Sequence, residues 1–149
     1  MTETPVLHGI HHLKIPVSDL SRSLDFYERS LDATRIPEAD HRRHSDGALY
    51  AYLLRVPGVD GLLELRLDSK RALAHSGFDP ITLAVPDRQN LTLWHERLTA
   101  RHIKHSPVIT AIQAWLIVIE DPDGHRIRLY TLEQHGPELP PDETNPWVS

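Results

Sequence analysis

The sequence contains no cysteine, so disulfide bonds, thiolate metal ligands and a cysteine nucleophile are all excluded. No uninterrupted apolar run approaches the ~18 residues that a membrane-spanning helix requires. A glycine-rich phosphate loop is also missing, and we find no Ser, His and Asp in an arrangement typical of a catalytic triad. Other residue types must therefore carry the function of this chain.

The sequence also contains fewer basic than acidic residues. The 16 Lys and Arg residues stand against 21 Asp and Glu residues, which gives a net charge of -5. A chain of this sign offers no general electrostatic surface for nucleic acid or for an anionic membrane. Its N-terminus lacks the basic and apolar regions of a signal peptide. With 149 residues, enough to bury one core, we expect a soluble, cytoplasmic protein of a single domain.

What the sequence does contain is an order of elements that occurs twice. In the first half, branched apolar residues predict a strand over residues 10–17, and Ser18 and Asp19 provide capping oxygens for a helix. The apolar residues of that helix, from Leu20 to Leu31, recur at spacings of four, three and four. Further strands are predicted over residues 34–37, 48–56 and 61–67.

The second half repeats this order. A strand over residues 80–86 and the capping residue Asp87 precede a helix whose stripe comprises Leu91, Trp94 and Leu98. Val17 and Val85 are 68 residues apart, as are Asp19 and Asp87. Strands follow over residues 103–110, 112–120 and 126–132, the last one after the turn at 121–124. Residues 134–149 are proline-rich and polar, and we expect an extended or disordered tail.

This repeat predicts an α+β fold of two βαβββ modules, over residues 6–70 and 77–133. Each sheet buries one face under its own helix, because its strands carry one apolar face. We expect the opposite faces of the two sheets to curve toward each other and to line a shared cup.

The segment from His12 to Tyr27, with the sequence HLKIPVSDLSRSLDFY, resembles the opening of the vicinal oxygen chelate superfamily. This superfamily includes glyoxalase I, extradiol dioxygenases, and the fosfomycin and bleomycin resistance proteins. The turn Asp121-Pro122-Asp123-Gly124 resembles the turn before the last strand of that fold, and the resemblance covers residues 8–133. It implies that the two modules form a half-open mixed β-barrel and that the protein is a homodimer.

The resemblance also implies where a divalent metal would be bound, at one residue from the first and one from the last strand of each module. Those positions are His12 and Glu64 in the first module, and Pro80 and Arg128 in the second. Proline has no donor atom, and a guanidinium is permanently cationic. We therefore expect no cofactor. The alternative is one divalent metal ion held by His12, Glu64 and a third ligand.

His12 is then the candidate general base, and Glu64 the carboxylate that orients it. Arg128 is the candidate clamp for an anionic group of the ligand; alternatively, it forms a structural ion pair with Glu64. Further ligand-binding candidates lie on strands that should border the cup, although aromatic residues at strand spacing also occur in cores: Tyr130, Tyr50, Tyr52, Trp115 and Gln113. The pairs His41/His44 and His102/His105 are interpreted as solvated histidines.

These residues favour a protein that binds a small organic molecule in the cup without a metal, either to sequester it or to transfer a proton. One alternative is a metal-dependent glyoxalase-like lyase or extradiol dioxygenase that uses His12 and Glu64. A second alternative is a dimerising scaffold without catalytic activity. In each case we expect neither nucleic acid nor a membrane as a partner.

Overall fold

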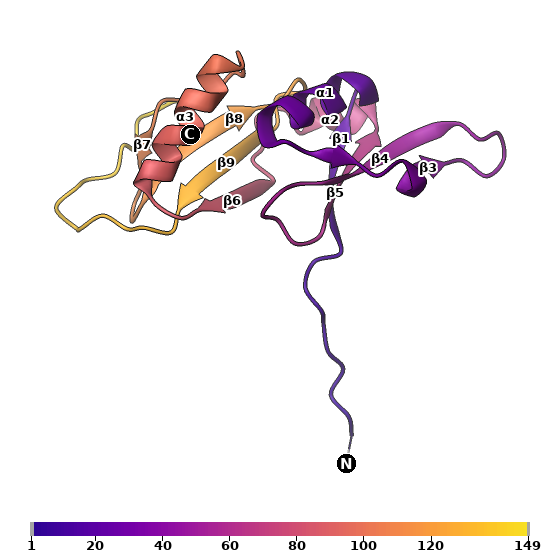
Figure 1. Ribbon diagram of the computed structural model, residues 1–149, viewed down its shortest axis with the longest axis horizontal. Helices are drawn as coiled ribbons and strands as arrows, with labels where there is room; N and C mark the ends of the chain where they lie inside the picture. Colours follow the sequence, from indigo (N-terminus) through magenta and orange to yellow (C-terminus); the bar gives the residue numbers. More distant parts are fainter. Residues whose placement is uncertain (1, 149) are drawn as a thin grey trace.

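Two mixed β-sheets, one from each half of the chain, form the frame of the protein in the computed structural model, which describes residues 2–148 (Figure 1). The first sheet has the strand order β1-β5-β4-β2, and β3 also pairs with β4. β1 and β5 are parallel, and the other pairs are antiparallel. The elements of this half are β1 (His12–Val17), α1 (Leu20–Leu31), β2 (Thr34–Arg35), the 3-10 helix η1 (Pro37–Ala39), β3 (His41–Arg42), β4 (Leu49–Arg55), β5 (Leu62–Leu67) and α2 (Ser69–Ala74).

The second sheet has the corresponding order β6-β9-β8-β7. As in the first sheet, the strand that comes first in the sequence, β6, pairs in parallel with the strand that comes last, β9. Its elements are β6 (Ile81–Val85), α3 (Arg88–Ala100), β7 (Ile109–Thr110), β8 (Trp115–Glu120) and β9 (Arg126–Thr131). Apart from the additional short strand β3, the same succession of strand, helix and three strands thus occurs in both halves. This confirms the α+β fold and the internal repeat predicted from the sequence.

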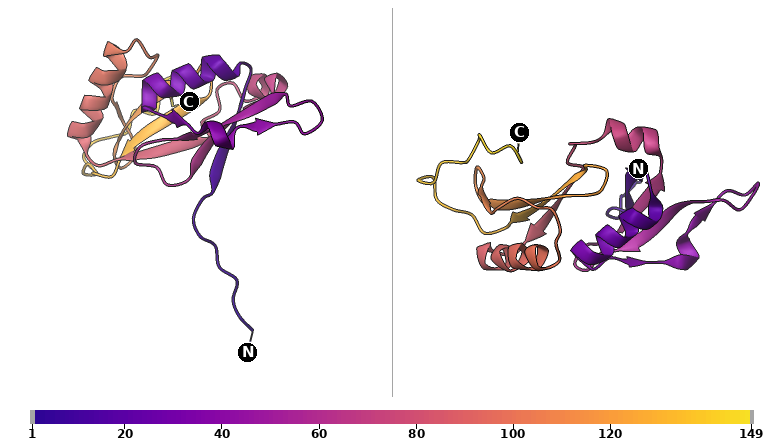
Figure 2. Two further views of the ribbon diagram at one scale, coloured as in Figure 1. Left: turned by 45° about the vertical axis from the view of Figure 1, so that its right-hand side comes forward. Right: turned by 90° about the horizontal axis from the view of Figure 1, so that it is seen from above.

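Both long helices start at the predicted capping residues. The Asp19 side chain accepts a hydrogen bond from the Arg22 amide at 3.0 Å, and Asp87 accepts one from the Asn90 amide at 2.8 Å. α1 and α3 lie on the same side of the two sheets (Figure 2). The apolar faces of both halves therefore merge into one core, and each sheet keeps a face that is turned away from α1 and α3. We call this the open face.

Buried polar contacts join the two halves. The Tyr27 hydroxyl, from α1, donates a hydrogen bond to Asp121 at 2.8 Å, and Asp121 also contacts the buried His125 ring. Burial, followed by the Asp121 charge, raises the pKa of Tyr27 well above its ordinary value. At the surface, Asp32, directly after α1, pairs with Arg97 of α3 and with Arg101, directly after α3. The turn at 121–124 therefore fixes one half of the molecule against the other.

The segment predicted as a strand over residues 103–110 is largely irregular. Only Ile109–Thr110 forms a strand, and a single bridge joins His105 to Ile119. Pro107 interrupts this segment and has no amide hydrogen for a ladder, which gives a physical reason for the short strand.

The tail that we predicted to be extended or disordered forms no helix or strand in its described residues, but its end packs against the protein. Trp147 and Val148 lie on the open face of the second sheet, against the buried side chains of Ile109, Leu116 and Val118. Arg126 donates hydrogen bonds to the carbonyl oxygens of residues 146 and 147 at 3.2 Å. We call residues 137–148 the C-terminal segment. Its apolar end covers side chains that would otherwise face water.

Among the described residues, no helix has the length and apolar character needed to cross a bilayer.

Candidate functional site

A buried carboxylate lies on the open face of the first sheet. Glu64 is only 1% exposed, while its neighbours Leu63 and Leu65 point into the core on the other face of β5. The His12 Nε2 atom lies 3.4 Å from Glu64 Oε1, and the Arg66 Nε atom donates to Glu64 Oε2 at 2.6 Å. The predicted pair of His12 and Glu64 is therefore in contact, and Arg66 provides the charge that a buried carboxylate needs.

A second histidine reaches the same carboxylate. Strand β3 pairs with β4 and brings His41 Nδ1 to 3.9 Å from Glu64 Oε1, with no hydrogen-bond partner for this buried nitrogen. The sequence interpretation of His41 as a solvated histidine missed this position, because β3 is too short to show a periodic pattern. Arg66 was also missed, although strict alternation in β5 puts it on the face of Glu64.

A hollow of about 810 Å³ opens beside this cluster. Its wall is formed by β1, β5, α2 and the segment around β3, and Arg66 lies both in the hollow and against Glu64. The Arg66 guanidinium lies over the Tyr50 ring at 5.0 Å, so the predicted residue Tyr50 lines this hollow. We call this space the first-sheet hollow. Its size is in the range of small-molecule sites.

Arg128 and Tyr130 lie elsewhere. Arg128 Nε pairs with Asp79 at 2.6 Å, so the ion pair considered between Arg128 and Glu64 is not formed. Arg128 and Tyr130 line a cavity of about 350 Å³ between the second sheet and the C-terminal segment. This cavity shares no lining residue with the first-sheet hollow. The expected common cup is thus replaced by two separate spaces in the single chain; Arg128 lines one of them, and His12 lines neither.

The other predicted contact residues lie outside both spaces. Tyr52 is 9% exposed and belongs to the main core, because it shares a face of β4 with Leu54. Trp115 packs partly against the same core and against the His135 ring at 5.3 Å. The exposed Gln113 accepts a hydrogen bond at its backbone oxygen from the His135 amide.

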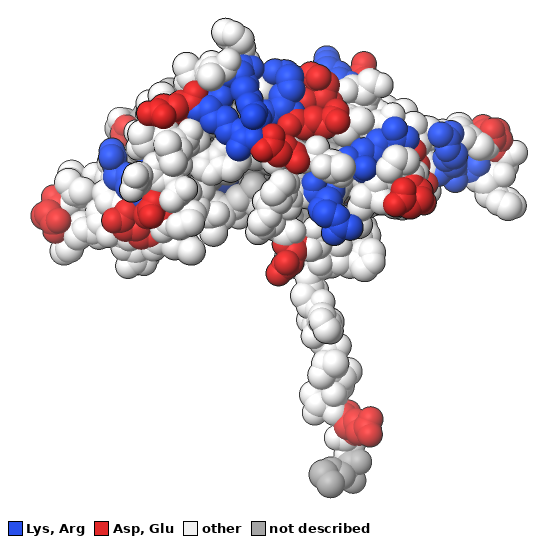
Figure 3. All heavy atoms as spheres, in the orientation of Figure 1, with Lys and Arg blue, Asp and Glu red and all other residues white. Residues whose placement is uncertain are grey.

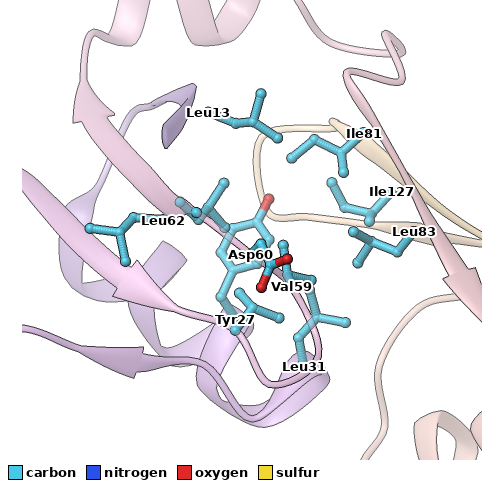
Figure 4. A pocket seen from close by; sticks show the side chains of 12 residues that line it. Leu13, Tyr27, Leu31, Val59, Asp60, Leu62, Ile81, Leu83 and Ile127 are labelled. Carbon is cyan, nitrogen blue, oxygen red and sulfur yellow. The ribbon is translucent and has the colours of Figure 1, made fainter. Parts of the chain in front are cut away.

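An apolar crevice at the junction of the two halves is too small for an organic ligand. Leu13 and Leu62 of the first sheet face Ile81 and Ile127 of the second across it, with Asp60 nearby (Figure 4). Its volume of about 30 Å³ accommodates little more than a water molecule. The first-sheet hollow is therefore the stronger candidate.

The divalent ion implied by the sequence resemblance does not fit these residues. One oxygen of Glu64 is already bonded to Arg66, whose charge opposes a cation. The second-half positions are Pro80, which has no donor, and Arg128, which pairs with Asp79. Within residues 2–148, no group of three or more His, Asp and Glu side chains is arranged to hold a metal ion.

Comparison with known proteins agrees with the fold. The family model of the Glyoxalase/Bleomycin resistance protein/Dioxygenase superfamily matches residues 9–129. The metallothiol transferase FosB of Bacillus licheniformis is 27% identical over 131 residues, which are 83% of this chain and 75% of FosB. The putative ring-cleaving dioxygenase MhqA of Bacillus subtilis is 24% identical over 87% of this chain, which spans only 42% of MhqA.

Among solved structures, TnmS3, an antibiotic binding protein from a Streptomyces species, superimposes with a TM-score of 0.65 at 18% identity. The match covers 86% of this chain and 98% of TnmS3. The family match extends over most of the chain, and the paired sheets of the structure agree with it. The chain therefore belongs to the Glyoxalase/Bleomycin resistance protein/Dioxygenase superfamily.

Proposed function

We propose that this protein binds a small organic molecule in the first-sheet hollow, without a divalent metal ion, and that His12 exchanges a proton with it. The observation that carries this proposal is the contact of His12 with the buried Glu64, whose other partner, Arg66, lines a large open space. A histidine held by a carboxylate is a common device for proton transfer. The His12 side chain is 39% exposed, so a ligand has access to it.

The two ring nitrogens of His12 have different partners. Nε2 faces the Glu64 carboxylate at 3.4 Å, which favours a proton on Nε2 and leaves Nδ1 as the proton acceptor. Nδ1 lies 3.0 Å from Nδ1 of the exposed His11. Because the His11 ring is exposed, a ligand can replace it at His12 Nδ1, and the proton that Nδ1 takes from the ligand can pass to His11 and to water after the ligand leaves. Glu64 stabilises the imidazolium that forms in this step.

Relatives in the superfamily support a small molecule as the ligand. TnmS3 is an antibiotic binding protein and FosB a transferase, so this fold accommodates both binding and chemistry on small molecules. Membership of the same superfamily also supports a homodimer. Sedimentation of the full chain tests the oligomeric state: we expect twice the chain mass of 17.0 kDa. A monomer at micromolar concentration would contradict the homodimer.

Screening of small organic molecules against the full chain by ligand-observed NMR tests the site. We expect the Tyr50→Ala substitution, in the wall of the hollow, to abolish binding of the hits, and the matched Tyr130→Ala substitution, in the wall of the other cavity, to leave it unchanged. The His12→Asn variant should still bind the hits, but it should no longer accelerate the exchange of the ligand's acidic proton with solvent, which the parent protein accelerates. Hits that require Tyr130, or an equal rate of proton exchange in the parent protein and His12→Asn, would contradict the proposal.

A further inference from the structure

Cationic side chains dominate the first-sheet hollow. A single acidic side chain, Asp68, lines it, against five cations: Lys14, Arg42, Arg43, Arg66 and Arg71. The chain as a whole has a net charge of -5, so this excess is local and does not follow from the composition. Concave spaces lined by one sign of charge concentrate ions of the opposite sign.

Two of these cations have no acidic partner among the described residues. Lys14 lies on β1, and Arg42 on β3 donates to the backbone oxygen of Gly47 at 3.2 Å. The other three each have one acidic neighbour: Glu64 for Arg66, Asp46 for Arg43, and Asp68 for Arg71. The hollow therefore keeps positive charge on two different strands that its own carboxylates do not neutralise.

Two arginines at the C-terminal end of α3 provide a contrast. Arg97 and Arg101 both pair with Asp32, and Figure 3 shows positive and negative side chains next to each other over α1 and α3. Those cations lie on the outer surface of the protein, and the adjacent carboxylate of Asp32 neutralises part of their charge. In the first-sheet hollow, by contrast, the unpaired cations surround a space of about 810 Å³.

Apolar side chains complete the wall of the hollow. Pro16 and Leu67 line it, and so does Tyr50, whose ring lies under the Arg66 guanidinium. A ligand with only charged groups would leave these surfaces without a partner. The combination fits a carbon skeleton that carries charged groups at its edge.

We infer that the molecule bound in the first-sheet hollow is a small organic anion with at least two negative charges, held by Lys14 and Arg42. This inference rests on the proposed function, because it names the ligand class of the same site. Phosphate and carboxylate groups share the required chemistry, since both accept paired hydrogen bonds from arginine. The concave shape and the negative charge of the rest of the chain favour a small molecule over a nucleic acid.

Calorimetric titration of the full chain tests the inference with three probes: succinate, its neutral isostere succinamide, and inorganic phosphate. We expect succinate or phosphate to bind, and succinamide to bind about tenfold more weakly or not at all. Comparison of the two anions shows whether carboxylates or phosphate are preferred. An increase of ionic strength should weaken the binding of the anions and not that of succinamide.

Charge reversal locates the site. Arg42→Glu and Lys14→Glu should each weaken anion binding by about tenfold or more. Arg55→Glu, at an exposed position outside the hollow, changes the net charge equally and should stay within about twofold. Equal weakening in Arg42→Glu and Arg55→Glu would overturn the inference, as would equal binding of succinate and succinamide.

Two further outcomes separate this inference from the proposed function. If neutral molecules bind in a way that depends on Tyr50 while neither anion binds, the ligand class is wrong and the proposed site stands. If the anions bind with the expected dependence on Arg42 and no molecule responds to His12→Asn, the ligand class stands and the proton-transfer role is wrong. A short single-stranded oligonucleotide that binds more tightly than both anions, with the same dependence on Arg42, would overturn the assignment to a small molecule.

Discussion

At the scale of single residues, Glu64 has the most demanding environment. Its carboxylate is buried and contacts Arg66 and two histidines. Removal of one partner of a buried ion pair leaves the other without compensation. Glu64→Ala should therefore lower the free energy of unfolding by about 3 kcal/mol in urea denaturation. The exposed Glu38→Ala serves as the control and should change it by less than about 0.5 kcal/mol. Equal values for both variants would show that Glu64 is solvated.

Tyr27 is the second residue with a strong prediction. Its hydroxyl is the donor to Asp121, and both groups are buried at the junction of the two halves. Tyr27→Phe removes that donor, so we expect the free energy of unfolding to fall by about 1–3 kcal/mol. Tyr130→Phe is the matched variant, because no described residue forms a hydrogen bond with its hydroxyl. It should remain within about 0.5 kcal/mol of the parent protein. A larger loss in Tyr130→Phe than in Tyr27→Phe would contradict this account.

Sequence reasoning brought His12 and Glu64 together because the family resemblance implies both positions, and because side chains alternate between the two faces of a strand, which puts both on the face opposite α1. It missed His41, since a strand of two residues has no period to recognise. It also expected Arg128 near Glu64, whereas Arg128 pairs with Asp79 of its own half. Which residues of two different elements come into contact depends on how those elements pack in three dimensions. A pattern along the sequence does not contain this information.

At the scale of elements, the C-terminal segment should contribute to stability. The Trp147 ring packs on the second sheet and lies within 6 Å of two cations, with Lys104 at 5.8 Å and Arg126 at 5.3 Å from its centre. Trp147→Ala should lower the free energy of unfolding by about 1–3 kcal/mol, through lost burial and lost cation–π contacts. Leu132→Ala, at a side chain that is 70% exposed, is the control. An unchanged stability in Trp147→Ala would show that the segment is detached in solution.

His135 should make the attachment of this segment depend on pH. Its ring nitrogens bond to the backbone oxygens of Gly136 at 2.8 Å and Ala111 at 2.7 Å, and these bonds raise its pKa above 6.5. Both nitrogens are donors only in the protonated ring. Because the folded-state pKa is the higher one, the stabilisation is fully present below the unfolded-state pKa of about 6.5 and is lost as pH rises through the raised value.

Hydrogen exchange measures this effect at the Asp142 amide, which donates to the Thr110 oxygen at 2.9 Å. After correction for intrinsic exchange, its protection should decrease as pH rises through the pKa of His135. The decrease should be absent in His135→Gln. Protection that is independent of pH in the parent protein would show that His135 does not hold the segment.

The long elements were predicted from the sequence because their signals are local. α1 and α3 start at Asp19 and Asp87, and their core residues follow the expected stripes. The short strand β3 and the fold of the C-terminal segment were not predicted. Trp147 and Val148 follow a proline-rich stretch, and their burial depends on the second sheet, to which no local pattern refers.

At the scale of the whole molecule, the internal repeat was sufficient to predict the fold. Two equivalent sheets bury one common core, and the contacts of Asp121 and Asp32 fix them against each other. The net charge of -5 gave no indication of the basic hollow, because a sum over the whole chain does not show where positive side chains cluster. The proposed division of roles follows: the first sheet binds the ligand, and the C-terminal segment covers the second.

The most direct test of the central claim is an amide chemical-shift map of the full chain, recorded in the presence of EDTA during titration with succinate. We predict saturable shifts confined to β1, β3, β5 and α2, around His12 and Arg42, although no divalent ion is available. Shifts on the second sheet around Arg128 and Tyr130, or no shifts until Zn²⁺ or Mn²⁺ replaces the EDTA, would contradict it.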